Sequence, residues 1–151
     1  MKAAVLLIFL VVPSCLLGQG EVVRRKHYNI KNDIGVDGYD PVTYFEGGPK
    51  EGRETIKFSY KGVTYFFSSP NTLNKFKSDP DRYEPAYGGW CAYAMGEKGE
   101  KVKVDPETFK IVEGRLYLFY NFWGNNTLED WNENEKKLKE AADRNWLATI
   151  K

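Results

Sequence analysis

A ten-residue segment gives the strongest signal for the local fold: Tyr60-Lys61-Gly62-Val63-Thr64-Tyr65-Phe66-Phe67-Ser68-Ser69. Residues 63–67 are rich in β-branched and aromatic residues, and residues 56–60 alternate between apolar and polar types. Because only Lys61-Gly62 separates the two runs, we expect a β-hairpin. Ser69 is a plausible N-cap, and the next residue is a proline, which is favoured at the first helical position. This pattern predicts a short helix to about Ser78.

Further elements are predicted on both sides of this segment. Residues 42–45 contain strong β formers and follow a turn, so they predict a short strand. Residues 108–112 and 115–120 predict a second hairpin. A longer C-terminal helix should begin near Thr127, and its apolar stripe consists of Leu128, Trp131, Leu138, Ala142 and Trp146. The expected fold class is therefore α+β, with small antiparallel hairpins, a short helix after the second hairpin strand and a longer C-terminal helix.

Composition is compatible with one compact domain and favours no polyanionic partner. The chain has 151 residues, of which 42% are hydrophobic and 15% aromatic. Its 22 basic and 21 acidic residues give a net charge of +1, so no electrostatic attraction to nucleic acid or to an anionic membrane is indicated.

The first twenty residues resemble a secretory signal peptide. Lys2 precedes an apolar run over 3–12, which is too short to span a bilayer, so no transmembrane helix is predicted. We expect cleavage near Gly20 and a secreted or periplasmic protein; a lipoprotein anchored through Cys15 is the alternative. The expected organisation is a signal peptide at 1–20, an extended polar lead-in at 21–35 and a single domain at 36–151.

The segments 60–69 and 76–83, with Asp40-Pro41-Val42 upstream, resemble the YHS domain. The resemblance covers about residues 36–85, and the remainder looks like the extension of a stand-alone secreted YHS subgroup. For metal-binding members, the resemblance implies cysteines at the positions occupied here by Thr43, Ser68 and Thr72. Hydroxyl groups are poor ligands for soft or borderline metals because they stay protonated near neutral pH. The family's metal site is therefore expected to be degenerate.

Cys91 is the one residue that suggests chemistry of its own. After cleavage near Gly20 it would be the single cysteine, so an intramolecular disulfide is excluded. A buried structural thiol is the favoured interpretation. The alternatives are a redox-active thiolate, or a copper or zinc ligand assisted by Met95, His27 or backbone groups. A pairing of Cys91 with His27 also stays open.

The leading functional hypothesis is a non-enzymatic extracytoplasmic binding module. Its partner would be a small ligand, a metal ion or a protein, held near Trp90, Cys91 and Tyr93. Asp40 and Tyr44 could add a carboxylate and a phenol for a polar ligand, although an aspartate before proline more often caps its own turn. Asn125-Asn126-Thr127 fits the N-glycosylation sequon, which has meaning in a eukaryotic source.

Overall fold

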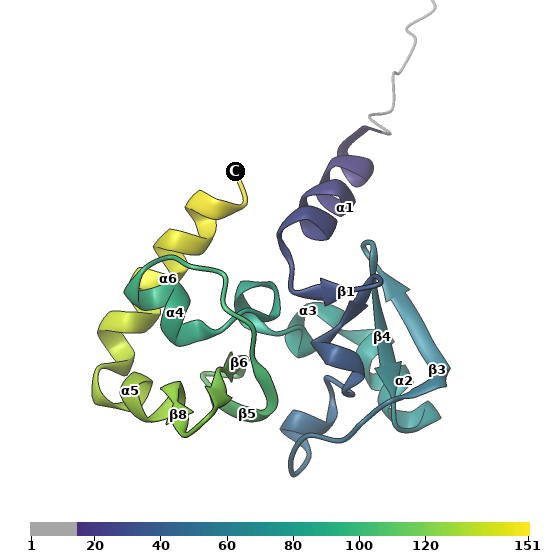
Figure 1. Cartoon of the computed structure of the whole chain (residues 1–151). Coiled ribbons are helices and arrows are strands. Elements are labelled where there is room, and N and C mark those ends of the chain that lie inside the picture. Colours follow the sequence, from purple (N-terminus) through teal and green to yellow (C-terminus); the bar gives the residue numbers. More distant parts are fainter. Residues whose placement is uncertain (1–14) are drawn as a thin grey trace, which may run out of the picture.

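The computed structural model describes residues 15–151, with side chains from Gly20 onward. Figure 1 shows a sheet-containing unit on the right and a mainly helical unit with its own hairpin on the left. The buried side chains form two hydrophobic clusters: one joins the sheet and α2 to the second hairpin, and the other lies around Trp131 in the helical unit. This arrangement confirms the α+β fold class.

The first unit is built around a four-stranded sheet in the order β1-β2-β4-β3. Strands β2 and β4 pair in parallel, and the other two pairs are antiparallel. Its elements are α1 (Cys15–His27), β1 (Ile30–Lys31), β2 (Ile34–Gly35), the 3-10 helices η1 (Val36–Gly38) and η2 (Thr43–Phe45), β3 (Arg53–Tyr60), β4 (Val63–Phe67), α2 (Pro70–Ser78) and α3 (Pro80–Tyr83).

The central hairpin and the helix behind it confirm the prediction. Strands β3 and β4 meet at Tyr60 and Val63, and the two turn residues between them both have positive φ. The side chain of Ser69 accepts a hydrogen bond from the backbone N–H of Thr72, which closes a capping box at the start of α2. The rings of β4 pack on Phe76, which is fully buried.

Two expectations about the N-terminal half are wrong. Residues 43–45 form the 3-10 helix η2 instead of a strand, because the Asp40 side chain and carbonyl accept bonds that curl this segment. Residues 21–27 belong to helix α1 and are not extended. The reason is the buried guanidinium of Arg24, which can reach the body of the protein only if this segment docks as a helix.

The second unit packs three helices against the second hairpin. Its elements are the 3-10 helix η3 (Ala86–Gly89), α4 (Ala92–Glu97), β5 (Asp105–Val112), β6 (Arg115–Phe119), β7 (Asn121–Phe122), β8 (Asn125–Asn126), α5 (Thr127–Glu133) and α6 (Glu135–Thr149). Trp131 fills the centre of this core, with its ring 5.6 Å from that of Tyr117 and 5.5 Å from that of Phe119. The predicted second hairpin is confirmed as β5–β6.

The C-terminal helix is present, but it is divided. Asn134 has an extended φ of −142°, so it ends α5 and begins α6. The first part begins at Thr127, as expected, and Asn126 is its N-cap. The apolar stripe is confirmed because Trp131 and Ala142 are fully buried and the other three members pack against the same core. None of the helices within residues 15–151 combines the length and apolarity needed to cross a bilayer.

Candidate functional site

Asp40 is fully buried, and its carboxylate holds two parts of the chain together. One oxygen accepts the backbone N–H of Val42 at 3.0 Å. The other accepts both the backbone N–H of Ser68 at 2.7 Å and the Ser68 hydroxyl at 2.8 Å. Asp40 therefore caps its own turn, as expected, and also ties that turn to the end of β4. All three hydrogen bonds that the Asp40 carboxylate accepts therefore stabilise the fold.

The two threonines at the other implied ligand positions are used in the same way. Thr43 donates its hydroxyl to the carbonyl of Asp40 at 2.8 Å and accepts the N–H of Lys50 at 3.1 Å. Thr72 donates to the carbonyl of Ser69 at 3.0 Å within the capping box of α2. Each hydroxyl of the implied metal site thus has an internal hydrogen-bond partner.

Tyr44 and Trp90 also make structural contacts. The Tyr44 hydroxyl donates to the carbonyl of Pro106 at 2.7 Å, and burial raises the pKa of this phenol well above its ordinary value. Trp90 donates its indole N–H to the carbonyl of His27 at 2.6 Å, which ties the end of α1 to the second unit. Neither side chain lines the hollows described below.

Cys91 is fully buried and belongs to the core. Its sulfur lies 3.4 Å from the Thr127 hydroxyl and accepts the backbone N–H of Tyr120 at 3.4 Å. His27 is not its partner, because the imidazole Nδ1 lies 3.0 Å from the Lys101 ammonium. These surroundings favour the structural interpretation of the thiol over a solvent-accessible nucleophile. Within residues 15–151, the structure brings no three His, Cys, Asp or Glu side chains together around a common metal position.

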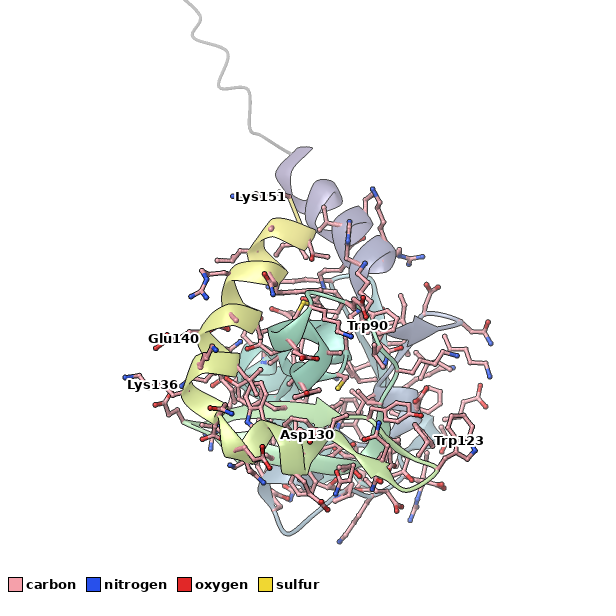
Figure 2. The ribbon with its side chains drawn as sticks, turned by 60° about the vertical axis from the view of Figure 1, so that its left-hand side comes forward. Trp90, Trp123, Asp130, Lys136, Glu140 and Lys151 are labelled. Carbon is pink, nitrogen blue, oxygen red and sulfur yellow. The ribbon has the colours of Figure 1, made fainter. Side chains whose placement is uncertain are left out.

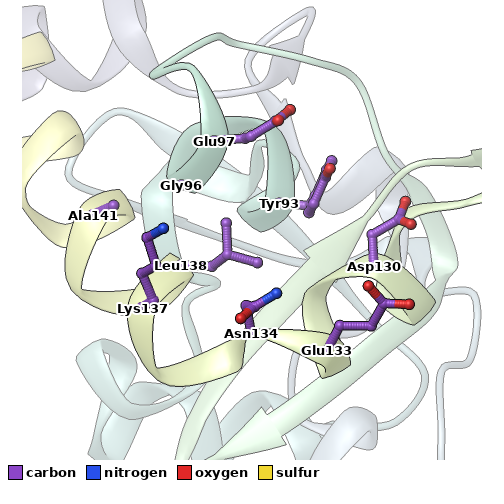
Figure 3. Close-up of a pocket in the computed structure, with 9 residues that line it drawn as sticks. All are labelled: Tyr93, Gly96, Glu97, Asp130, Glu133, Asn134, Lys137, Leu138 and Ala141. Atoms are coloured by element: carbon purple, nitrogen blue, oxygen red, sulfur yellow. The ribbon is translucent and has the colours of Figure 1, made fainter.

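Tyr93 is the predicted site residue that lines both of the hollows nearest to it. It stands between two hollows, with volumes of about 300 and 220 Å³. The larger one, which we name the acidic cleft, lies between α4, α5 and α6 (Figure 3). It is lined by Tyr93, Gly96, Glu97, Asp130, Glu133, Asn134, Lys137, Leu138 and Ala141. Cys91 contributes to the wall of the smaller hollow.

The shape of the acidic cleft depends on close contact between α4 and α6. A Cβ on Gly96 would lie only 2.6 Å from the carbonyl oxygen of Leu138, so a glycine is needed where the two helices meet. Asn145 of α6 donates to the carbonyl of Met95 at 2.8 Å and fixes the same contact. Gly96 and Leu138 both line the cleft, so this contact forms part of its wall.

The electrostatics of the acidic cleft are unbalanced. Glu97 and Tyr93 extend from α4, while Asp130 and Glu133 extend from α5 on the opposite side (Figure 3). None of these three carboxylates takes part in an ion pair with another described residue, and Lys137 is the single cation of the lining. Burial, followed by the charges of Glu97 and Asp130, raises the pKa of Tyr93. The cleft therefore presents a phenol among three carboxylates and one ammonium group, an excess of negative charge.

Sequence reasoning missed the three carboxylates of this cleft. Glu97 lies more than thirty positions before Asp130 and Glu133, and on a helix surface such residues resemble an ordinary solvated face. The available signal was the glycine at position 96 inside a short helix, because a glycine in a helix often marks close packing.

Comparison with known protein families gives a match within the first unit. The model of the YHS domain family matches residues 49–87, which span β3, β4, α2 and α3. The chain contains a YHS domain. YHS domains are often linked to metal binding. Searches of the curated proteins and of the solved structures gave no significant match. Of the three implied ligand positions, Ser68 and Thr72 lie within the matched residues, whereas the acidic cleft lies outside them.

Proposed function

We propose that this chain is an exported, non-enzymatic binding protein in which the acidic cleft, and not the YHS domain's metal position, holds the ligand. The observation that carries the proposal is the set of three unpaired carboxylates around Tyr93. The three carboxylates are exposed, so solvent screens their mutual repulsion, and together they set up a negative potential over the cleft that attracts a cation. A cationic ligand would supply the counter-charge.

The ligand class that fits best is a small organic cation, such as an amine. A hollow of about 300 Å³ is at the lower end of the range for small-molecule sites. The carboxylates come from opposite walls and do not converge on one point, so they suit an extended or bulky cation better than a bare metal ion. Tyr93 offers an aromatic face for a cation–π contact, and Leu138 offers apolar surface.

The loss of metal binding in the YHS domain is supported by the chemistry at its implied ligand positions. Thr43, Ser68 and Thr72 carry hydroxyl groups, and all three are engaged in hydrogen bonds of the fold. A transition metal would have to displace these bonds and would gain only weak neutral ligands in return. A metal site at these positions is therefore disfavoured on two counts.

Export is supported by the sequence of the N-terminus. A lysine followed by the apolar run over 3–12 is typical of a signal peptide. Residues 1–14 lie outside the described part of the structure, so this part of the proposal depends on the sequence alone. The alternative of a lipoprotein anchored through Cys15 is distinguished by the mass of the mature N-terminus.

Isothermal titration calorimetry with spermidine and with choline tests the binding proposal. We expect at least one of them to bind, with an affinity that falls as salt is added. Asp130→Asn and Glu133→Gln should each weaken binding by about threefold to tenfold, because each removes one charge near the bound cation. Glu140→Gln is the matched control, since Glu140 is an exposed carboxylate of α6 outside the cleft lining.

Two results would contradict the proposal. The first is binding that the cleft variants leave unchanged, or no binding of either cation at millimolar concentration. The second is stoichiometric copper or zinc in the purified protein that disappears on Ser68→Ala. That result would return the ligand site to the YHS domain. Metal that disappears on Cys91→Ser would instead support the alternative of a thiol ligand.

A further inference from the structure

The hairpin formed by β7 and β8 carries an aromatic side chain that is almost completely exposed to solvent. Asn121 pairs with Asn126 and Phe122 with Asn125, so Trp123 and Gly124 form the turn. The side chain of Trp123 is 94% exposed, and Figure 2 shows it at the periphery of the molecule. Its ring centre lies 5.9 Å from that of Phe122, which is itself 39% exposed.

Trp123 is also poorly suited to its place in the turn. Its φ is 53°, and that of Gly124 is 78°, which is the pattern of a two-residue turn with both residues in the left-handed region. Asparagine or aspartate is preferred at the first of these positions, because a bulky side chain is strained there. A residue that is both strained and unburied is evidence for a role outside the packing of the fold.

The same turn carries the one N-glycosylation sequon of the chain, Asn125-Asn126-Thr127. Asn125 is exposed, and its side-chain amide has no hydrogen bond to any other described residue. Thr127 is buried and donates its hydroxyl to the carbonyl of Tyr120 at 3.0 Å. The sequon hydroxyl is therefore accessible before this hairpin closes, and the asparagine stays accessible afterwards.

We propose that Asn125 is N-glycosylated in the secretory pathway of a eukaryotic cell, and that the first sugar of the glycan covers the ring of Trp123. Only Gly124 separates the two residues in the tight turn, so the first sugar on the Asn125 amide is attached two residues from the indole. The C–H groups of a sugar ring pack well on the electron-rich face of an aromatic ring. This occupant explains the exposure of Trp123, because the ring is covered once the glycan is present.

The covalent step needs a lipid-diphosphate-linked oligosaccharide as donor and a glycosyltransferase of the secretory pathway. The Nδ2 atom of Asn125 forms a bond to C1 of the first N-acetylglucosamine and loses one proton. The bond between C1 and the diphosphate oxygen breaks, and the lipid diphosphate leaves with the electron pair. The inference rests on the export part of the proposed function, since only exported chains meet this donor.

The first test is expression of the full chain in a mammalian secretory host. We expect secreted protein whose mass falls on treatment with peptide-N-glycosidase F, with peptide mass spectrometry placing the resulting Asn-to-Asp conversion at position 125. Asn125→Gln should abolish the shift. Asn126→Ser should keep it, because serine preserves both the sequon and an N-cap for α5. Secreted protein without a glycan overturns this inference alone, whereas retention of unmodified chain inside the cell overturns the proposed export as well.

The second test measures the contact between the sugar and Trp123. Enzymatic removal of the glycan should lower Tm by about 2 °C in the parent protein, as expected for the loss of one stacking contact in a chain of this size. In Trp123→Ser the same treatment should leave Tm unchanged. The enzyme converts Asn125 to aspartate in both proteins. The difference between their two changes in Tm therefore measures the contact between the sugar and the Trp123 ring. Equal shifts in the two proteins would overturn the covering of Trp123.

Discussion

The attachment of α1 to the YHS domain depends on one buried ion pair, and Arg24→Met should remove it. The guanidinium of Arg24 and the carboxylate of Glu84 form a two-pronged contact, and their side chains are only 10% and 9% exposed. Arg24 also donates to the carbonyl of Lys61 at 3.0 Å and to the hydroxyl of Tyr28 at 2.9 Å. Burial by itself would lower the pKa of Arg24, but the hydrogen bond and charge of Glu84 raise it well above the ordinary value.

The expected loss of stability follows from what the substitution leaves behind. Methionine preserves most of the apolar stem, but Glu84 keeps a single strong partner, the hydroxyl of Tyr65 at 2.6 Å. Removing one partner of a buried ion pair destabilises a protein by about 3–5 kcal/mol, because the other charge stays buried without compensation. Two charge-assisted hydrogen bonds at roughly 1.5–3 kcal/mol each give a similar figure.

Arg25→Met is the matched control on the same helix. Its guanidinium lies 3.4 Å from Asp33, and the two side chains are 54% and 50% exposed. An exposed pair of this kind contributes about 0–1 kcal/mol. The contrast between adjacent arginines separates the effect of burial from any general effect of losing a positive charge from α1.

Urea unfolding at neutral pH, followed by far-ultraviolet circular dichroism and tryptophan fluorescence, measures both variants. With a slope of about 2 kcal/mol per molar urea, Arg24→Met should lower the midpoint by roughly 2 M. The double variant Arg24→Met/Glu84→Gln should recover part of the loss, because it removes the uncompensated charge. A loss below about 1 kcal/mol for Arg24→Met, or a double variant no more stable than the single one, would refute the reasoning.

Three further predictions concern buried polar groups of the fold. Burial raises the pKa of Tyr44 and of Tyr65, so the unfolded chain loses these protons first. The contribution of these two groups to the free energy of unfolding should be constant between about pH 8 and 10 and fall by roughly 1.4 kcal/mol per pH unit per tyrosine above about pH 10, as urea midpoints between about pH 8 and 11 would show. Asp40→Asn should destabilise by about 2–3 kcal/mol, because an amide nitrogen cannot accept the hydrogen bonds of Ser68; a neutral result in chemical denaturation would contradict this. Cys91 should resist alkylation in the folded protein and react fully in denaturant, and rapid labelling under native conditions would show that the thiol is not enclosed.

The parts of the fold that sequence analysis predicted correctly are those with short-range signals. The hairpin at Lys61-Gly62 and the capping box at Ser69 are complete within a few residues, so neighbouring residues determine them. The strand expected at 42–45 was wrong because the β propensity of these residues is overridden by the hydrogen bonds to Asp40. Tertiary bonding of this kind is not visible in a local pattern.

The acidic cleft could not have been predicted in the same way. Tyr93 was singled out for its aromatic neighbourhood, yet its partners come from α5 and depend on how α4 packs against α6. The contact between Gly96 and the backbone of Leu138 sets that packing. A contact over about forty residues is a property of the assembled core, so charge and periodicity alone leave it undetermined.

The position of the anchoring contacts constrains where the N-terminal segment can be cut. The contacts that hold α1 and the following residues come from Arg24, from the carbonyl of His27 and from Asn29, whose backbone N–H donates to the carbonyl of Gly88 at 2.9 Å. A cleavage near Gly20, as proposed, leaves all of these contacts in place. A cut beyond Arg24 would leave Glu84 buried without its cation, with the same penalty as Arg24→Met. Under the proposed export, a cut that keeps the Arg24–Glu84 ion pair must therefore precede Arg24.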